Sequence, residues 1–390
     1  EIYTLSLHDA LPILVIVIHV KNKNQKDNPG FAHHKRPHLC YPCTVYFLTC
    51  LCSFPLYHNS VYTGCMLQGN ECAESTVWNE VIYDLGGHPL QLWGWGEVKS
   101  MHNWHAHRIL FTDQQGGIVG AAQILERILP KPFRRLCYVP RGPVCREGDA
   151  AAVYEALTAY VSHHLPGTLL TVEPDTKSVP EVAGWRRSSN TILIPKTLIL
   201  DLHHSEEELL AAMTKKTRQY IRKSERAGIT LRRIKAMDDV EKLLKIYHQT
   251  AKRANFALHD DQYYRDVHIN LGDSSLIFAA YEGSEPIAFV WLAASQETAF
   301  ELYGGMNERG QALRANYALK WFAIRKCREW GISRYDMNGL LNDGISNFKR
   351  GFANHDDMLA GTYDYPLSPL YSIWAGLLPT AKKIIRRIKH

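Results

Sequence analysis

The residues best placed to do chemistry in this sequence are cations and aromatic side chains. Phe348 and Lys349 stand side by side after a predicted strand, Arg334–Met337, and a glycine-containing loop, Gly339–Gly344. Loops that follow the central strands of an α/β sheet open onto the ligand-binding cleft, so Lys349 can bring a positive charge to a reacting carbonyl group. The sequence contains no Gly-x-Ser-x-Gly elbow, no His-Glu-x-x-His motif and no Cys/His nucleophile signature. It therefore favours electrostatic stabilisation over covalent or metal-dependent catalysis.

A second concentration of cations lies on a helix predicted to begin after Ser205 and to stop at Gly228. Ser205 is a good N-cap, and Glu208 stands three residues later, which is the pattern of a capping box. One side of this helix is apolar, and the opposite side carries a row of cations: Lys215, Arg218, Arg222 and Arg226. A solvated face normally mixes charges of both signs, whereas this row is almost purely positive. We favour a phosphate- or RNA-binding ridge, with a solvated face as the alternative.

The composition is that of an ordinary globular chain that is long enough for two domains. The 390 residues are 46% hydrophobic and 22% charged, which argues against intrinsic disorder. A net charge of +6 suits an acidic partner, although many proteins without such a partner are equally basic. Most cysteines precede residue 76, where Cys40 and Cys43 lack a second ligand pair of zinc-site spacing. Cys137, Cys145 and Cys327 are scattered over the rest, which fits a reducing compartment.

The N-terminal stretch differs from the rest of the chain. Residues 1–13 resemble a conceptual translation of a common sequencing adapter. Residues 14–65 show neither helical nor strand periodicity and are rich in Cys, His and Tyr. We expect residues 1–75 to be a spurious or disordered extension, and translation to start at Met66.

One order of elements, three strands followed by a helix and a closing strand, occurs twice in the remaining sequence. Glycine-containing turns separate the first two strands of each copy. The first copy comprises His107–Thr112, Ile118–Leu125, Tyr138–Val144, Asp149–Leu165 and Leu169–Val172. The second copy comprises Leu276–Tyr281, Ile287–Ala293, Thr298–Tyr303, Ala315–Trp330 and Arg334–Met337. The repetition predicts two mixed α/β domains, and the order of elements is that of the GNAT acyltransferase core.

Several segments resemble motifs of the FemAB family, whose members transfer amino acids from aminoacyl-tRNA to the peptide of a peptidoglycan precursor. The segments are Trp93–Lys99, Tyr138–Val144, Pro195–Leu202 running into Arg218–Gly228, Tyr335–Gly339 and Phe348–Phe352. They occur in the order of the family and are spread over most of the chain after residue 76.

The resemblance implies an α/β fold of two tandem GNAT-like domains packed together, in the shorter, FemX-like form without a coiled-coil arm. We expect the first domain over residues 76–200, the second over 201–365, and a basic helix over 366–390. The implied partners are aminoacyl-tRNA as co-substrate, with no cofactor, and a precursor that is either lipid II or UDP-MurNAc-pentapeptide. A monomeric, cytoplasmic enzyme is expected. Its basic helix could lie on the inner membrane surface, or it could pack on the second domain.

The resemblance also assigns residues to the precursor. The family holds the diphosphate of the precursor between its domains with a lysine and an arginine, which correspond by motif to Lys99 and Arg226. The alternatives are a simple surface lysine and a cation that interacts with the C-terminus of its helix. Arg141 stands in a tight bend between Pro140 and Gly142, where it either binds substrate or braces the turn.

Lys349 is the implied cation for the oxyanion of the tetrahedral intermediate, and Phe348 can stack on the terminal adenine of the tRNA. The alternatives are a core phenylalanine and a surface lysine. We expect Arg222 on the basic ridge to contact tRNA, and Tyr303, on a strand facing the same cleft as Lys349, to contact substrate. Family members often carry an Asp two residues after Gly-Pro-Val, as a proton acceptor, but Arg146 stands here. The proton would then leave through water or through the tRNA itself.

Two other functions remain open at this stage. A CoA-dependent GNAT enzyme would cradle a pyrophosphate on a glycine-rich loop, but Asn307–Ala315 has one glycine and lacks the spacing of that loop. A duplicated GNAT shell could also bind precursor or RNA without catalysing transfer. The sequence does not specify which amino acid is transferred.

Overall fold

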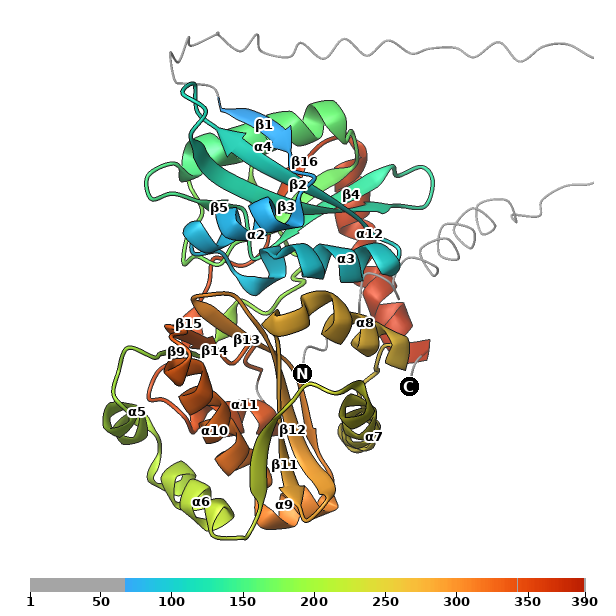
Figure 1. Cartoon of the computed structure of the whole chain (residues 1–390). Coiled ribbons are helices and arrows are strands. Elements are labelled where there is room, and N and C mark those ends of the chain that lie inside the picture. Colours follow the sequence, from blue (N-terminus) through green and yellow to red (C-terminus); the bar gives the residue numbers. More distant parts are fainter. Residues whose placement is uncertain (1–66, 342, 389–390) are drawn as a thin grey trace, which may run out of the picture.

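The computed structural model describes residues 67–341 and 343–388, and Figure 1 shows them as two α/β domains stacked on each other. Each domain is built on one large sheet with helices on both faces. This confirms the predicted fold class of two tandem α/β domains, and the described chain has no coiled-coil arm. The predictions for residues 1–66, including the adapter-like segment, lie outside the described residues.

The first domain is a mixed sheet between two helical layers. Its elements are β1 (Gln68–Glu71), α2 (Ser75–Asp84), η1 (Pro89–Gln91), α3 (Trp93–Met101), β2 (His105–Thr112), β3 (Ile118–Ile128), β4 (Arg135–Pro140), β5 (Val144–Cys145), α4 (Ala150–His164), β6 (Leu169–Glu173), β7 (Arg186–Arg187), β16 (Tyr363–Pro366) and α12 (Leu370–Ile388). The strand order is β1-β2-β3-β4-β6-β16-β7, with β5 paired to β3. Helix α4 packs on one face, and α2 and α3 lie on the face toward the second domain.

The second domain has the same layered construction. Its elements are β9 (Ile199–Asp201), α5 (Glu206–Ala212), α6 (Lys215–Glu225), β10 (Thr230–Ile234), α7 (Met237–Ala254), α8 (Asp261–Leu271), η2 (Gly272–Ser274), β11 (Ser275–Glu282), β12 (Glu285–Ala294), β13 (Thr298–Met306), α9 (Glu308–Leu313), α10 (Ala315–Glu329), β14 (Arg334–Asp336) and α11 (Gly344–Arg350). The strand order is β10-β11-β12-β13-β14-β9. Helices α10 and α6 lie on one side of this sheet, and α7 and α8 lie on the other. A separate ribbon pairs β8 (Lys196–Thr197) with β15 (Asp357–Met358).

Three segments lie in a different part of the fold from the one predicted. Strand β1 lies within the stretch expected to be spurious or disordered, yet it pairs with β2 over four residues. Strand β9 begins at Ile199, inside the predicted first domain, but it pairs with β14 of the second sheet. Strand β16 lies inside the predicted second domain and pairs with β6 and β7 of the first sheet. The chain therefore returns to the first domain before its last helix.

The basic helix predicted over residues 205–228 is wrong as a single element, because the chain forms α5 and α6 with a break between them. Thr214 has an extended backbone, and its hydroxyl accepts the N–H of Thr217 at 3.2 Å, which starts a new helix. The Arg218 guanidinium donates to the carbonyl oxygen of Met213 and so satisfies an acceptor at the end of α5. Arg218, which was expected on the basic ridge, therefore stabilises the junction between α5 and α6.

Strands β13 and β14 run side by side over only three residue pairs, the last of which is Phe300 with Asp336. Beyond this point β13 continues along β12 to Met306, whereas β14 has ended. The two strands therefore separate in the middle of the sheet. Glu301 borders the opening on one side and Asn338 on the other, and the Asn338 amide donates to the Glu301 carbonyl oxygen at 2.9 Å.

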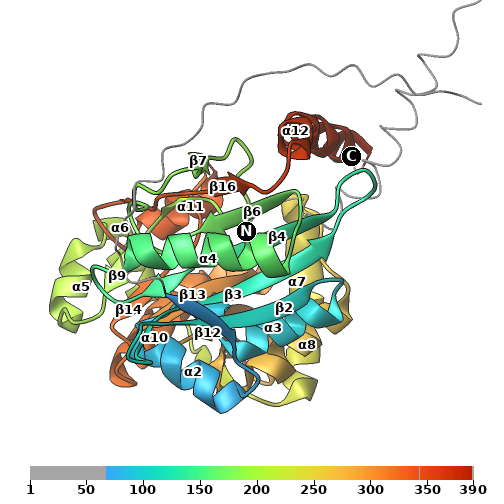
Figure 2. The ribbon, with the colours of Figure 1, turned by 90° about the horizontal axis from the view of Figure 1, so that it is seen from above.

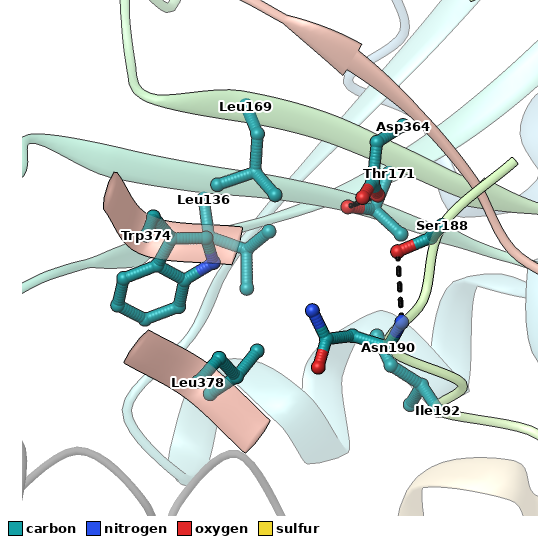
Figure 3. A pocket seen from close by; sticks show the side chains of 9 residues that line it. All are labelled: Leu136, Leu169, Thr171, Ser188, Asn190, Ile192, Asp364, Trp374 and Leu378. Atoms are coloured by element: carbon teal, nitrogen blue, oxygen red, sulfur yellow. Dashed lines mark hydrogen bonds between the residues drawn. The ribbon is translucent and has the colours of Figure 1, made fainter. Parts of the chain in front are cut away.

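The last helix packs on the first domain, so the alternative of packing on the second domain is wrong. Figure 2 shows α12 beside β16, and the Trp374 and Phe133 rings meet with centroids 5.1 Å apart. A cavity of about 20 Å³ remains beneath the helix (Figure 3). Its lining is Leu136, Leu169, Thr171, Ser188, Asn190, Ile192, Asp364, Trp374 and Leu378. This space holds about one water molecule, so it is not a substrate site. No helix in the described part of the chain, α12 included, is both long and apolar enough to cross a bilayer.

Candidate active site

Lys349 lies in the last turn of the short helix α11, where it is only 5% exposed. Asp343 caps this helix by accepting the N–H of Ser346 at 2.7 Å. The Lys349 Nζ donates to the carbonyl oxygen of Gly339 at 3.2 Å and lies 3.5 Å from that of Asn338. Both carbonyls follow β14, so the ammonium group faces the opening between β13 and β14. The surface alternative for this lysine is wrong, and its catalytic role stays a prediction.

A buried ion pair that sequence analysis did not single out stands near this lysine. Glu301 on β13 pairs with Lys320 on α10, and neither side chain is more than 10% exposed. Tyr335 on β14 donates its hydroxyl to the same carboxylate at 2.8 Å. Buried charges are tolerated when they are paired and hydrogen-bonded, and this carboxylate has both kinds of partner. Two lysines, Lys320 and Lys349, thus share the field of one carboxylate.

The electrostatics of this cluster make Lys349 unlike a surface lysine. Burial lowers the pKa of the Lys349 ammonium, Glu301 opposes this shift, and Lys320 adds to it. Burial and the Glu301 carboxylate raise the pKa of Tyr335 well above its ordinary value, so this phenol stays neutral and acts as a donor. Strongly shifted groups beside an opening in the sheet are typical of functional sites.

Phe348 is half-buried next to this cluster. Its ring packs edge-on against Tyr317 and Phe352, with centroids 4.9 and 5.2 Å apart. The Lys320 Nζ lies 5.6 Å from the Phe348 ring centre. The ring is therefore not enclosed in the core, and its exposed part is available to a ligand that approaches Lys349.

Lys99 lies on the other side of the second sheet, where α3 packs against α8. Gly94 makes this packing possible, because a Cβ atom at this position would lie 2.1 Å from the carbonyl oxygen of Asn270. The Lys99 Nζ donates to the Tyr263 hydroxyl at 2.7 Å and lies 4.5 Å from the centre of the Trp95 ring. The Trp-Gly-Trp-Gly-Glu-Val-Lys motif therefore fixes a half-buried cation between the two domains.

Tyr303 also lies on the α7/α8 side, so the expectation that it shares a cleft with Lys349 is wrong. Its ring meets those of Tyr264 and Trp291, with centroids 5.0 and 5.5 Å apart. A register shift leaves Leu302 as an extra residue in β13, which turns Tyr303 to the face opposite Glu301. Burial raises the pKa of the Tyr303 phenol well above its ordinary value, so it is no proton acceptor near neutral pH. A substrate contact by this ring stays a prediction.

The structure does not bring Arg226 near Lys99. Arg226 is the exposed C-cap residue of α6, and Arg222 is exposed one turn earlier. The chain then enters β10, where Thr230 pairs with Tyr281 beside the β11–β12 turn. This turn lies at the end of the second sheet away from the first domain (Figure 1). The geometry therefore does not support a joint grip of the two cations on one diphosphate.

Arg141 reaches across the boundary between the domains. It directly follows β4, has a positive φ of 52° and is 2% exposed. Its guanidinium carbon lies 5.8 Å from the ring centre of Phe300 in the second domain. Within the described chain, Nε and Nη2 have no hydrogen-bond acceptor. Arg146, which replaces the family Asp, is exposed just beyond β5.

Three possible metal ligands meet at the same boundary, but their hydrogen bonding argues against a metal centre. His88, Asp175 and Asp336 offer ligand atoms that all lie within 4.8 Å of one another. The Nδ1 of His88 accepts the N–H of Leu90 at 3.1 Å, so Nε2 carries the ring proton and is a donor. Burial lowers the pKa of His88 to about 3, which keeps the ring neutral. Asp175 is held by both terminal nitrogens of Arg334. The Asp175–Arg334 ion pair joins the two domains, and the neutral His88 ring lies beside it.

An open groove of about 460 Å³ runs along this boundary. It is lined by Asp175, Thr176, Lys177, Ile199, Leu200, Asp201, His203, Ser333, Arg334, Asp357 and Leu359. A groove of this size fits part of an extended ligand. Lys349 and Lys99 are not among its lining residues, so it is separate from both cation sites.

The sequence marks the Glu301–Lys320 pair, which the sequence analysis did not single out, more clearly than it marks His88. Glu301 is the only charged residue of the strand Thr298–Met306, and Lys320 stands between Leu319 and Trp321 on a mostly apolar helix face. A charge inside an apolar run is uncommon unless it is paired, which could have drawn attention to both. Nothing in the local sequence pairs His88 with residues of another domain.

Comparisons with known proteins agree with this fold. The FemAB family profile matches residues 185–283 and 281–378. Lipid II:glycine glycyltransferases of Staphylococcus aureus strains MRSA252 and USA300 are each 22% identical over 404 residues, covering 78% of this chain and 95% of the relative. The crystal structure of FemX shares the fold, with a TM-score of 0.71 at 18% identity, covering 79% of this chain and 100% of that one. The chain belongs to the FemAB family.

Proposed function

We propose that this protein is an aminoacyltransferase that moves an amino acid from aminoacyl-tRNA onto a peptide amine of a peptidoglycan precursor. Family membership and relatives named as lipid II:glycine glycyltransferases support peptidoglycan as the target and glycine as the first amino acid to test. The acceptor is lipid II or the soluble UDP-MurNAc-pentapeptide.

The observation that carries this proposal is the position of Lys349 at the opening between β13 and β14. A buried ammonium group there can stabilise negative charge in a water-poor environment, where electrostatic interactions are strong. Glu301 and Lys320 lie on the α10 side of the sheet at this point, and Tyr303 lies on the α7/α8 side. On this proposal the donor and the acceptor approach the point where β13 and β14 separate from these opposite faces.

The chemistry needs few protein groups. The acceptor amine attacks the ester carbonyl carbon of the aminoacyl-tRNA, and a tetrahedral oxyanion forms. Lys349 stabilises this oxyanion, the bond between the tetrahedral carbon and the 3′ oxygen breaks, and the 3′ oxygen leaves with the ribose of the tRNA. The proton lost by the amine passes to water or to the leaving oxygen. Aminolysis of an ester is downhill, so the reaction as proposed uses no cofactor.

Lys99 is suited to the precursor on the α7/α8 side. A lysine ammonium carries three N–H donors, and Tyr263 accepts one of them. The others can reach a phosphate oxygen, with the aromatic rings around Lys99 as an apolar wall. Phe348 and the cations of α6 lie on the α10 side, which suits the tRNA donor.

The CoA-dependent alternative is less compatible with the fold. The segment that would cradle a pyrophosphate forms α9. The Asn307 side chain already occupies the N–H of Gly310 at 2.9 Å, and the Asn307 carbonyl occupies that of Gln311 at 3.0 Å. Backbone donors at this position are therefore engaged within the helix.

We further propose that the enzyme works as a monomer in the cytoplasm and reaches lipid-linked acceptor at the inner face of the membrane. Several large apolar side chains are exposed on the first domain and at its border with α8, which is compatible with a peripheral contact. They are Met101, Ile128, Ile269 and Ile373.

The test is to incubate the purified chain with glycyl-tRNA and, separately, lipid II or UDP-MurNAc-pentapeptide, and to weigh the products. The expected result is one acceptor heavier by a glycyl residue. The same assay with a mixture of charged tRNAs covers other amino acids. If no charged tRNA gives a product and acetyl-CoA acetylates the acceptor, the CoA-dependent function replaces the proposed one.

A further inference from the structure

A continuous row of aromatic rings leads from the Lys349 site to the surface of α6. Phe348 meets Tyr317 of α10, and Tyr317 meets Tyr220 of α6, with centroids 4.9 and 5.0 Å apart. Tyr317 and Tyr220 are both partly exposed. The row therefore differs from the aromatic cluster on the α7/α8 side, where Tyr263 and Tyr264 are at most 3% exposed.

Cations flank the outer end of this row. The Arg314 guanidinium carbon lies 3.7 Å from the Tyr220 ring centre, and the Lys216 Nζ lies 5.7 Å from it. Lys223 is three residues after Tyr220, and Lys216 four residues before it, so both share its side of α6. Among the described residues, no ion pair engages any of these three cations. Their charge remains available to an anionic ligand.

The backbone conformation of Arg314 helps to position its side chain. Arg314 ends α9 and precedes α10 with a left-handed φ of 56°, a conformation that is uncommon for a residue with a side chain. This turn places its guanidinium over the Tyr220 ring. Side-chain packing alone would not need a cation at this position.

We propose that Tyr317 and Tyr220, with Lys216, Lys223 and Arg314, form a stacking track for the single-stranded 3′ end of the RNA donor. Bases of unpaired RNA stack on successive aromatic side chains, and flanking cations bind the phosphates between them. The aminoacylated terminal nucleotide sits at Phe348, and the nucleotides before it lie on Tyr317 and Tyr220. This inference rests on the proposed function and extends the donor site beyond Phe348.

The experiment compares two glycyl donors that differ only in the nucleotides of this track. One is a minihelix RNA with a single-stranded CCA end esterified with glycine, and the other is glycyl-adenosine. In Tyr220→Leu and Tyr317→Leu, KM for the minihelix should rise about tenfold, as expected for the loss of one stacked base. The rate with glycyl-adenosine, which lacks the nucleotides placed on Tyr220, should stay at the wild-type value in Tyr220→Leu. Lys216→Glu should also raise KM for the minihelix, whereas Lys245→Glu, on the far side of the sheet, should not.

The outcomes separate this proposal from the proposed function. Unchanged KM for the minihelix in both tyrosine variants, or equal losses with both donors in Tyr220→Leu, would overturn the stacking track while leaving transfer intact. If the wild type transfers from neither donor, the proposed function fails. Binding of uncharged minihelix, followed by fluorescence anisotropy, then decides the track by itself. Weaker binding by the tyrosine variants supports it, and equal or absent binding refutes it. Unchanged melting temperatures exclude misfolding as the cause.

Discussion

The two sides of the second sheet use polar groups in opposite ways. On the α10 side, Glu301, Lys320 and Lys349 are charged groups held in the interior. On the α7/α8 side, Tyr303 and its neighbours pack in an aromatic cluster, and Lys99 lies at its edge. Burying a charged group costs free energy, so the three charged groups on the α10 side mark a site with a function other than packing. Neutral aromatic walls with one accessible cation are suited to holding a ligand.

This difference indicates a division of labour. The charged side is suited to stabilising a transition state, and the aromatic side to binding a substrate. The extra residue Leu302 in β13 is what separates the two, because it turns Tyr303 away from Glu301.

Replacing Lys349 by Ala should lower kcat by at least about 100-fold and by as much as about 1,000-fold, because one oxyanion donor is lost. The affinity for precursor and the melting temperature should stay near wild type. Single-turnover rates at saturating aminoacyl-tRNA measure this effect. Lys326→Ala, on the same helix as Lys320, is the matched control. A Lys349→Ala enzyme that keeps more than about a third of the wild-type rate would remove this lysine from the mechanism.

Lys99→Met should raise KM for the precursor by about 10- to 100-fold with kcat little changed, because one charge-assisted contact is lost. Methionine keeps the apolar stem against Trp95 and removes only the charge. Arg226→Ala should leave KM for the precursor near wild type, since Arg226 lies at the far end of the second sheet. Equal effects of the two substitutions would mean that the ligand-bound enzyme closes far enough to join them.

Activity should fall at alkaline pH as Lys349 loses its proton. Burial lowers the pKa of this lysine from its ordinary 10.5, so the alkaline limb of kcat should lie below pH 10.5. The Glu301 carboxylate raises the same pKa, so Glu301→Gln should move the limb to still lower pH. Profiles of kcat against pH for the two enzymes measure the shift. A limb that stays in place would show that another group titrates.

The domain boundary should give the smallest effect, on stability rather than on rate. Burial lowers the pKa of folded His88 to about 3 from 6.5. Between these pH values the unfolded chain binds a proton at this residue that the folded chain does not. The corresponding stability is therefore present above pH 6.5 and is lost as the pH falls toward 3.

In His88→Gln the free energy of unfolding should depend less steeply on pH in this window, by one proton. Urea unfolding across the window measures the slope. The exposed His203→Gln serves as the control. Equal slopes in wild type and His88→Gln would show that this ring is protonated in the folded chain.

Local patterns predicted much of this fold. The repeated order of strands and helices is present in both domains, and the Ser205–Glu208 capping box is formed. The incorrect predictions concern features that depend on contacts between distant segments or on small local irregularities. The break at Thr214 falls inside a helical pattern, and the shift at Leu302 inverts a strand face although Glu301, Leu302 and Tyr303 include no glycine or proline. Such features depend on tertiary contacts that periodicity does not describe.

The candidate site was predicted only in part, for the same reason. Motifs pointed to Lys349 and Lys99 as cations, but their placement on opposite sides of one sheet required the topology. The Glu301–Lys320 pair joins a strand to a helix, and the Asp175–Arg334 pair beside His88 joins two domains. Pairings between distant segments cannot be read from the spacing of residues along the chain.

The central claim is that the two substrates occupy opposite sides of the second sheet. The most direct test measures the binding of two ligands to the wild type and to two variants. Binding of UDP-MurNAc-pentapeptide and of uncharged minihelix RNA would be measured for wild type, Lys99→Met and Tyr317→Leu. We predict that Lys99→Met weakens only precursor binding and that Tyr317→Leu weakens only RNA binding. If either variant weakened both ligands equally, with folding intact, the assignment of one side to each substrate would be contradicted.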